Sequence, residues 1–382
     1  MRFSGFDDEW KTYKLKDLLH NKSSSISINQ LDDNVGNYPL YGASGFLKCI
    51  DFYEMDSDYI SIVKDGSGVG NISFHEKNTS VVNTSQYILP KENLNIHFIF
   101  YLLQTINLNK YKTGSTIPHI YFKDYSIEKV KIPKYDEQKK IGILLKNLDA
   151  KIEILDNKLQ MCQNFKKYLM QQIFTQKLRF NFTDEWEKYL LGDISLIGKG
   201  FTPSTSNPSF WDGDLKWLSI ADMNQGKYIN QTTKKITSDG SKNKEPVKKG
   251  TLLMSFKLSI GKLGILTEDM YTNEAICNFK WKNKDVLTEY MYYYLSSINI
   301  LKYGSQAAKG ITLNNETLST IPVLLPSLEE QKKIINILSD VDMKINMLEN
   351  SINDTSKFKK GLLQQMFVVQ LILSLLQNKK HI

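Results

Sequence analysis

PKYDEQKKIGILLKNLDAKIEILDNKLQMCQNFKKYLMQQIF occupies residues 133–174, and PSLEEQKKIINILSDVDMKINMLENSINDTSKFKKGLLQQMF occupies residues 326–367. The two stretches align without a gap at an offset of 193 residues, with nineteen of forty-two positions identical. A repeat of this length indicates that the chain consists of two related halves. In both copies apolar residues recur at alternating spacings of three and four, which predicts a long helix with one narrow apolar seam.

The two seams are expected to pair with each other, because a narrow seam suits a single partner helix. About 150 residues separate the two copies, enough for a domain that leads from the end of one helix to the start of the next. The helices then run antiparallel. Lys166 and Lys359 are the charged residues of the seam rows, at equivalent positions. The seam residues are Leu145, Leu148, Ile152, Leu155 and Leu159 in the first copy, and Leu338, Val341, Ile345, Leu348 and Ile352 in the second.

A shorter motif is also written twice. FDDEWKTYKLKDL at residues 6–18 recurs as FTDEWEKYLLGDI at residues 182–194. Each half therefore reads as a motif that anchors the domain to a helix end, a variable domain and a long helix. The expected segments are a first recognition domain with its motif (1–132), a central long helix (133–180), a second recognition domain (181–324) and a distal long helix with an apolar tail (325–382).

The variable domains predict an α+β fold. Short runs typical of β-strands, such as 59–63 and 252–256, alternate with glycine turns, and apolar helical stretches follow near 96–105 and 290–300. The overall prediction is two globular recognition domains joined by two long antiparallel coiled-coil helices, with a pseudo-two-fold internal repeat. Outside these landmarks the domains scarcely align, which indicates that a duplicated frame presents two different recognition domains.

Composition bounds the partners and the compartment. A formal charge of +8 favours an anionic partner such as nucleic acid. The three cysteines follow no metal or redox spacing, and the five histidines form no metal motif. The first ten residues lack a secretion signal, and no apolar run reaches 18 residues, so a cytoplasmic protein without a membrane partner is expected.

Motifs that would carry catalysis are weak. Asn207-Pro-Ser-Phe210 is similar to the Asn-Pro-Pro-Phe loop of adenine methyltransferases, but no glycine-rich loop for the methyl donor precedes it. A turn that packs Phe210 into the domain explains it better. Glu137-Gln-Lys139 and Glu330-Gln-Lys332 fit the Glu-x-Lys fragment of nucleases, but charges at helix starts explain them better. No P-loop is present. We expect a non-catalytic chain with no bound cofactor or metal.

The positive signal is lysine and serine in glycine loops at corresponding points of both domains. Lysines and hydroxyls in such loops suit phosphate contacts, and serine can also read base edges. Each loop taken singly also fits a solvated turn. The candidate DNA-binding residues are Lys64, Ser67, Lys110, Lys112 and Ser115 in the first domain, and Lys257, Ser259, Lys262, Ser305 and Lys309 in the second.

Together these features resemble one family. A Pro-x-x-x-Glu-Gln-x-x-Ile segment opens a long helix twice, and Phe-Lys-Lys-x-Leu-x-Gln-Gln-x-Phe stands near its end. This looks like the specificity subunit of type I restriction-modification systems. The resemblance implies that the chain recognises a bipartite, asymmetric duplex DNA target and directs two modification (methyltransferase) subunits and two restriction (endonuclease and translocase) subunits to it. S-adenosylmethionine, ATP and Mg²⁺ are then expected on those partner subunits. The alternative from another class is a coiled-coil adaptor that binds proteins through its two end domains.

Two geometric expectations follow. If the halves are pseudo-symmetric, the apolar tail at 367–376 lies near residues 3–18. If the helices act as a ruler between two half-sites, lengthening the junction at Leu178–Phe182 changes the accepted spacer. The apolar tail does not fit the family resemblance. The equivalent segment of the first half, which follows Phe174, is the polar run TQKLRF at 175–180.

Overall fold

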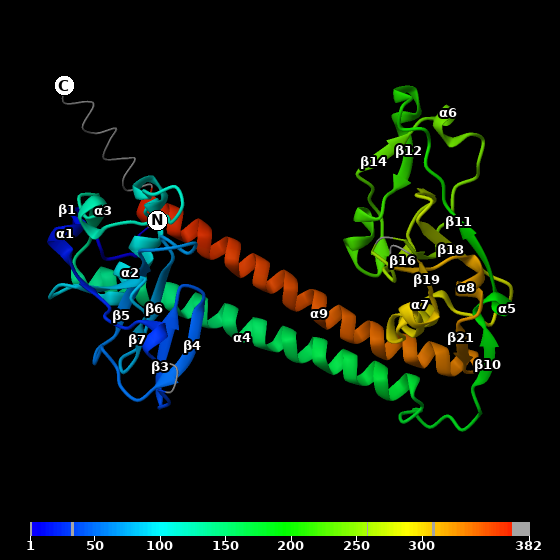
Figure 1. Ribbon diagram of the computed structural model, residues 1–382, viewed down its shortest axis with the longest axis horizontal. Coiled ribbons are helices and arrows are strands. Elements are labelled where there is room, and N and C mark those ends of the chain that lie inside the picture. The colour runs from blue at the N-terminus through cyan, green and yellow to red at the C-terminus, as the bar shows by residue number, and fades with distance from the viewer. Residues whose placement is uncertain (1, 32–33, 258, 308–309, 369–382) are drawn as a thin grey trace. The chain divides into compact units, whose positions relative to one another are not determined.

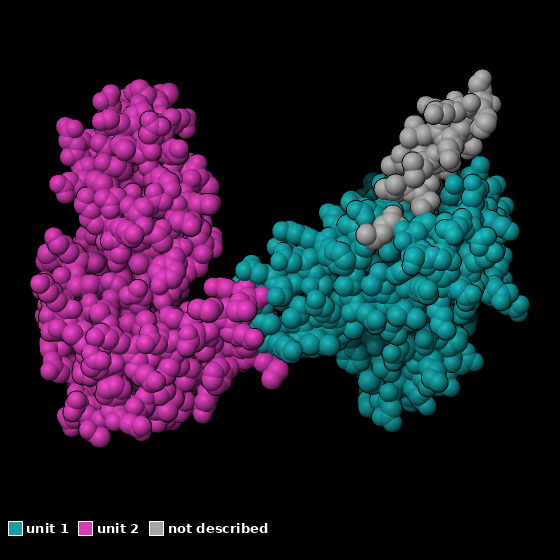
Figure 2. Space-filling view, turned by 180° about the vertical axis from the view of Figure 1, so that it is seen from behind, with its two compact units in different colours: residues 1–158, 348–382 teal, residues 159–347 magenta. Residues whose placement is uncertain are grey.

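The computed structural model describes residues 2–31, 34–257, 259–307 and 310–368, and its ribbon is drawn in Figure 1. The chain forms two compact units, one of residues 1–158 with 348–382 and one of residues 159–347 (Figure 2). Each unit holds one α+β domain and part of each long helix. The segments expected from the sequence divide the chain by element type, whereas the compact units divide it by packing.

The long helices are α4 (Tyr135–Phe174) and α9 (Leu328–Leu363), which continues as a short π-helical segment, η6 (Gln364–Val368). Both begin two residues after the proline expected to open them. The reason is the glutamine of the Glu-Gln pair, since Gln138 Nε2 donates to the Pro133 carbonyl at 2.9 Å and Gln331 Nε2 donates to the Pro326 carbonyl at 2.9 Å. The glutamine thereby closes the non-helical turn before the first helical residue.

In each unit the two helices run antiparallel. Unit 1 pairs the first half of α4 with the second half of α9, where Leu145 and Leu362 share one core (Figure 1). Unit 2 pairs the second half of α4 with the first half of α9, where Leu169 and Leu338 share another. The predicted seam residues Leu145, Leu338 and Leu348 are buried, and the others are half-buried: Leu148, Ile152, Leu155, Leu159, Val341, Ile345 and Ile352. The antiparallel helix pair is therefore confirmed.

The domain of unit 1 contains two sheets. The first has the order β2-β8-β5-β6, all antiparallel, and the second has the order β4-β3-β7. The strands are β2 (Leu19–Ser23), β3 (Tyr38–Gly42), β4 (Gly45–Ile50), β5 (Tyr59–Val63), β6 (Ile72–His75), β7 (Ser80–Val81) and β8 (Ser85–Pro90). Helical segments complete the domain: α1 (Leu15–Leu18), η1 (Ile28–Gln30), α2 (Ile96–Gln104), η2 (Leu108–Tyr111) and α3 (Phe122–Tyr125).

The domain of unit 2 repeats both sheets, since β14-β12-β17 corresponds to β4-β3-β7 with the same antiparallel and parallel pairings. The order β11-β18-β15-β16 corresponds to β2-β8-β5-β6, with β13 added at the edge. The strands are β11 (Ser195–Lys199), β12 (Trp211–Leu218), β13 (Tyr228–Ile229), β14 (Lys234–Ile236), β15 (Leu252–Ser255), β16 (Leu263–Leu266), β17 (Tyr271–Thr272), β18 (Ile276–Trp281), β19 (Ser305–Ala307) and β20 (Gly310–Thr312). The helical segments are α5 (Leu191–Ile194), η3 (Pro208–Phe210), η4 (Ala221–Gln225), α6 (Ser238–Ser241), α7 (Thr288–Ser297), η5 (Ile300–Tyr303) and α8 (Asn315–Ser319).

A two-stranded sheet attaches each domain to a long helix. β1 (Lys11–Lys14) pairs with β9 (Lys129–Ile132), which leads into α4. In unit 2, β10 (Glu187–Leu190) pairs with β21 (Pro322–Leu325), which leads into α9. The duplicated motif at 6–18 and 182–194 therefore anchors each domain to a helix start, as its position predicted.

The predicted closeness of the C-terminal segment to the N-terminal motif holds as far as the chain is described. The Phe367 ring packs edge-on against Trp10, with centroids 6.3 Å apart, and against Phe98 at 5.3 Å. Residues 369–382, most of the apolar tail, lie outside the described residues. The effect of lengthening the junction on the accepted spacer stays a prediction. α4 ends at Phe174, and Arg179 within Leu178–Phe182 ion-pairs with Glu330, so an insertion there would disrupt an anchor and leave the helices unchanged.

Candidate nucleic-acid interface

Two loops of the first domain come together at one edge. The loop after β5 and the loop before α3 are joined by backbone hydrogen bonds, from Gly66 N to Pro118 O at 2.9 Å and from Ile120 N to Lys64 O at 2.9 Å. The side chain of Lys112 lies at the same contact between the two loops. Its Cε would be 3.6 Å from a Cβ atom placed on Gly70. Four of the predicted DNA-binding residues thus belong to one loop pair: Lys64, Ser67, Lys112 and Ser115.

A third loop, which the sequence analysis did not single out, lies against this pair. The β3–β4 hairpin turns at residues 42–45, and a Cβ on Gly68 would lie 3.0 Å from the Ala43 Cβ. Phe46, the first side chain after the turn, is 61% exposed. An exposed aromatic ring beside lysine and serine loops suits contact with a base or a thymine methyl group. The assignment of Phe46 to the interface depends on the exposure of its ring, which the residue type alone does not predict.

The lysines of this edge differ in how far neighbouring carboxylates neutralise them. Lys64 pairs with Asp65 at 3.9 Å, and Lys110 pairs with Glu128. Partial burial pushes the pKa of Glu128 upward, but hydrogen bonds from Lys110 and Tyr111 outweigh burial and hold that pKa below its usual value. The side chain of Lys112 is exposed, and no hydrogen bond or ion pair joins its ammonium to any residue that the structure describes. Lys112 is therefore the lysine best placed to meet a phosphate.

The corresponding edge of the second domain is the turn between β15 and β16. Buried Ser255 closes it, because its hydroxyl donates to the Ser259 carbonyl and accepts from Lys262 N at 3.0 Å. Lys262 Nζ then donates to Asn224 Oδ1 at 2.7 Å, which brings η4 to the same surface. Lys257 is exposed, and its ammonium lies 5.7 Å from the centroid of Phe256. Asn224 was missed in the sequence because it lies 38 positions from its partner.

Two predicted DNA-binding residues of the second domain, Ser305 and Lys309, are not fully described by the structure. Ser305 opens β19, which pairs with β20 in register with Thr312, and its side chain is outside what is described. Lys309 also lies outside the described residues. The Asn207-Pro-Ser-Phe210 segment is a capped turn, since Asn207 Oδ1 accepts from Ser209 N at 3.1 Å and Phe210 is half-buried. This agrees with the packing interpretation of that motif.

The glutamates of the two Glu-Gln pairs are buried, which surface helix-end charges would not be. Glu137 receives two hydrogen bonds from Arg2, at 3.0 and 2.7 Å. Glu330 receives two from Arg179, at 2.7 and 2.9 Å, and a third from Trp186 Nε1 at 3.0 Å. Bidentate pairing with an arginine compensates the negative charge of each buried carboxylate. These residues hold the frame together.

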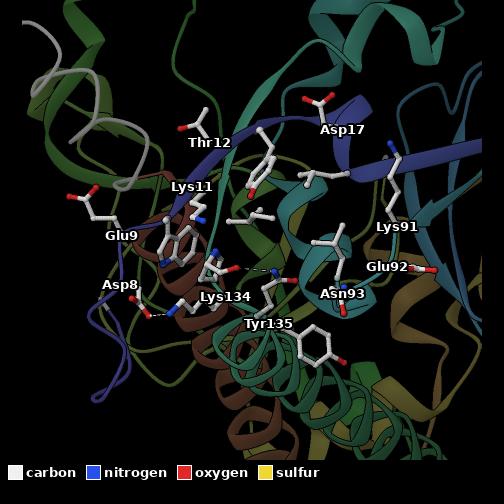
Figure 3. Close-up of a pocket in the computed structure, with 17 residues that line it drawn as sticks. Asp8, Glu9, Lys11, Thr12, Asp17, Lys91, Glu92, Asn93, Lys134 and Tyr135 are labelled. Atoms are coloured by element: carbon white, nitrogen blue, oxygen red, sulfur yellow. Dashed lines mark hydrogen bonds and ion pairs between the residues drawn. The ribbon is translucent and has the colours of Figure 1, made fainter.

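A cavity of about 810 Å³ lies at the attachment of the first domain to α4 (Figure 3). Its walls come from the Trp10 segment, from residues 91–94 and from the start of α4. Asp8 turns toward Lys134 and pairs with it at 2.8 Å, as Figure 3 shows. The cavity is a gap between anchoring segments. Within the described ranges, no group of three histidine, cysteine, aspartate or glutamate residues is placed to hold a metal, and no helix is long and apolar enough to cross a membrane.

Comparisons with known proteins agree with this layout. A family model described as the type I restriction modification DNA specificity domain matches residues 7–162 and 183–355. The MjaVIII specificity subunit of Methanocaldococcus jannaschii is 23% identical over 395 residues, covering 93% of this chain and 91% of that protein. The MjaIX specificity subunit of the same organism is 30% identical over 175 residues, but the alignment covers 44% of this chain and 39% of that protein.

The fold has a counterpart among solved structures. The S subunit of a type I restriction-modification system from M. genitalium superposes with a TM-score of 0.69 at 15% identity, covering 96% of this chain and 97% of that one. With two matched specificity domains on a duplicated frame of paired helices, the chain belongs to the type I restriction-modification DNA specificity family.

Proposed function

We propose that this chain is the specificity subunit of a type I restriction-modification complex and that it recognises a bipartite, asymmetric duplex. One half-site is read by the loops around Lys64 and Lys112, and the other by the turn that carries Lys257 and Lys262. The observation that carries the proposal is the contrast within the repeat. The anchors Arg2–Glu137 and Arg179–Glu330 are duplicated, whereas the loops at the domain edges differ.

The chemistry of the loops supports DNA as the ligand. Exposed lysines supply phosphate contacts that hold the protein on the duplex, and these contacts carry no sequence information by themselves. Base identity then comes from Ser67, Ser115 and Asn224 as hydrogen-bonding groups and from Phe46 as an apolar contact. These side chains differ between the domains, so the two half-sites differ in sequence.

The long helices offer surfaces for protein partners. Met161, Phe165 and Tyr168 lie at i, i+4 and i+7 on α4, and each is more than half exposed. Phe358 of α9, which corresponds to Phe165 at the 193-residue offset, is also more than half exposed. Exposed apolar side chains with helical spacing are typical of a surface that receives another helix. Phe165 and Phe358, the apolar position that both helices share, suit contacts with two copies of a modification subunit, and two restriction subunits complete the assembly.

The chain itself supplies recognition only. S-adenosylmethionine is expected on the modification subunits, and ATP with Mg²⁺ on the restriction subunits. The buried carboxylates Glu137 and Glu330 are each paired with an arginine, which gives them a structural role in the frame.

The test uses the full chain co-purified with its modification subunit. The complex is incubated with genomic DNA and S-adenosylmethionine, and methylated adenines are mapped by single-molecule sequencing. The expected result is methylation within one split motif with unequal halves and a constant spacer. A control complex without this chain should methylate no such motif.

Variants then show which domain recognises which half-site. Replacing Phe46 or Ser115 by alanine should change base preference in one half-site, while Asn224→Ala should change it in the other. A complex that assembles but methylates without sequence preference would overturn the proposal. A complex that assembles, binds no DNA at moderate salt and captures proteins through its end domains would favour the adaptor alternative.

A further inference from the structure

A lysine in the helix seam of unit 2 is held by an aspartate of the opposite helix. Lys166 of α4 pairs with Asp342 Oδ1 of α9 at 2.6 Å, and both side chains are about three-quarters buried. The other carboxylate oxygen, Asp342 Oδ2, accepts from the Tyr293 hydroxyl of α7 at 2.7 Å. The Lys166 ammonium also lies 5.5 Å from the centroid of the Tyr293 ring. Three elements therefore meet at one carboxylate: both long helices and the recognition domain.

Unit 1 contains the same arrangement with the helices exchanged. Lys359 of α9 pairs with Asp149 of α4, and the Tyr101 hydroxyl of α2 donates to Asp149 Oδ2 at 2.6 Å. The Lys359 ammonium lies 5.1 Å from the centroid of Tyr101. Lysine and aspartate both recur at the 193-residue offset, and the tyrosine comes from the corresponding helix of the other domain. We call these groups the Lys–Asp–Tyr triads.

A charged residue in a seam is a poor way to increase stability. A leucine at Lys166 or Lys359 would bury more apolar surface at no desolvation cost. A single polar position in a seam acts instead as a registration device, because every other alignment of the helices leaves its charge unpaired. The remaining seam positions are apolar or nearly so and tolerate a shift by one heptad, so the lysines carry the distinction between alignments.

The tyrosine extends this control from the helices to the domain. Its hydroxyl ties α7 or α2 to the same carboxylate that sets the alignment, so the domain cannot turn on the helices without losing a hydrogen bond to a charged group. The surroundings differ between units. In unit 2, Lys227 reaches the Tyr293 hydroxyl at 3.1 Å and Ser339 Oγ at 3.2 Å. In unit 1, Lys146 is the residue equivalent to Ser339, and its ammonium contacts His97.

We infer that the two Lys–Asp–Tyr triads are positioning groups that determine which spacer length the complex accepts between its half-sites. They fix the alignment of α4 with α9 and the orientation of each domain on these helices. The inference rests on the proposed function. A change of orientation that displaces a reading loop by about 3.4 Å along the duplex axis changes the accepted spacer by one base pair. Base identity, which belongs to the loops, stays the same.

The experiment measures spacer choice in the assembled methyltransferase complex. Tyr293→Phe and Asp342→Asn variants are tested on duplexes that carry both half-sites and spacers one base pair shorter, equal or one longer. We expect the variants to keep the half-site sequences and to methylate off-length spacers about tenfold more, relative to the preferred length, than the wild type does. Tyr293→Phe removes hydrogen bonds to Asp342, Lys227 and Ser339, and a tenfold factor corresponds to the loss of at least one hydrogen bond to a charged group.

Charge reversal separates positioning from general loss of stability. Lys359→Asp alone should relax spacer choice, and Lys359→Asp combined with Asp149→Lys should restore it, because the Tyr101 hydroxyl can accept from a lysine at position 149. Lys360→Ala, an exposed neighbour, is the matched control and should leave spacer choice unchanged. If Asp342→Asn fails to fold, Tyr293→Phe still gives the answer, since it removes one hydroxyl.

The outcomes are distinct. Wild-type spacer selectivity in an active Tyr293→Phe complex would overturn the role of the triads while leaving the proposed function intact. Failure of the wild-type complex to methylate any split motif would overturn the proposed function itself. Relaxed spacer choice that charge reversal restores would support the triads as the positioning groups.

Discussion

The guanidinium of Arg179 holds the buried carboxylate of Glu330 through two hydrogen bonds of 2.7 and 2.9 Å, although the residues stand 151 positions apart. Arg2 and Glu137 repeat the pair in unit 1 across 135 positions. The arginine precedes the duplicated tryptophan motif, and the glutamate stands in the first turn of a long helix. Each pair therefore connects the first residues of a domain to the helix that follows that domain.

Replacing Arg179 by alanine should lower the free energy of unfolding by about 3 kcal/mol, because it leaves the Glu330 carboxylate buried without its counter-ion. Urea denaturation followed by circular dichroism measures the loss. Lys177→Ala, at an exposed position of the same loop, is the control and should change stability by less than about 0.5 kcal/mol. Equal effects of the two substitutions would show that the ion pair contributes nothing.

The two duplicated tryptophans should respond differently to phenylalanine. Trp186 Nε1 donates to Glu330 at 3.0 Å, whereas Trp10 Nε1 is buried with no hydrogen-bond partner among the described residues. Trp186→Phe loses a hydrogen bond to a charged group, worth roughly 1.5–3 kcal/mol. Trp10→Phe loses packing only and should cost clearly less. Thermal and urea unfolding of both variants checks the order, and a larger loss for Trp10→Phe would contradict it.

Lys112 and Lys110 offer a comparison within one loop. Lys112→Ala should weaken DNA binding of the assembled complex across sequences and reduce the salt slope by about 0.9, as expected for one lost phosphate contact. Lys110→Ala should have a smaller effect, because Glu128 already pairs with that lysine. Affinity measured between low and moderate salt gives both slopes. A steeper loss for Lys110→Ala would show that Glu128 releases it on binding.

Burial of His75 predicts an acid-sensitive first domain. His75 contacts Ser61 Oγ at 2.9 Å, and burial lowers its pKa to about 4. Since the unfolded chain binds this proton near pH 6.5, the histidine contributes full stability above that pH. The contribution falls as pH drops from about 6.5 toward 4, by about 3 kcal/mol in total. Unfolding at pH 7 and pH 4.5, compared with a His75→Gln variant, measures it. A variant with the same pH dependence as the wild type would refute the assignment.

Exchanging residues 195–324 for the corresponding domain of another family member should change one half-site and leave the other half and the spacer nearly intact.

Inserting seven residues into α4 and seven at the facing position of α9 preserves the seam and lengthens each helix by about 10.5 Å. The accepted spacer should then grow by about three base pairs, with both half-sites unchanged. Genome-wide methylation mapping reads both outcomes. An altered base preference in the lengthened variant would argue against helices that act as a ruler.

The sequence by itself determined the repeat, the long helices and their antiparallel order. These features depend on local periodicity and on the 193-residue offset, both of which are written in consecutive residues. α4 ends at Phe174, where the sequence ends the repeat, and strand β5 has the bounds 59–63 that its β-branched run predicted. The family resemblance rested on the same motifs.

Only the tertiary structure decided what the conspicuous residues do. Lys166 and Lys359 stood out as charged seam residues, but their partners Asp342 and Asp149 lie in the opposite helix, and Tyr293 and Tyr101 come from the domains. The loop pair around Gly66 and Pro118 depends likewise on a backbone hydrogen bond across 52 positions. Such partners are chosen by how a whole domain packs on its helix, because the free energy of a buried charge depends on every group that surrounds it. A local sequence pattern does not show which groups surround a buried charge, so it cannot predict these partners.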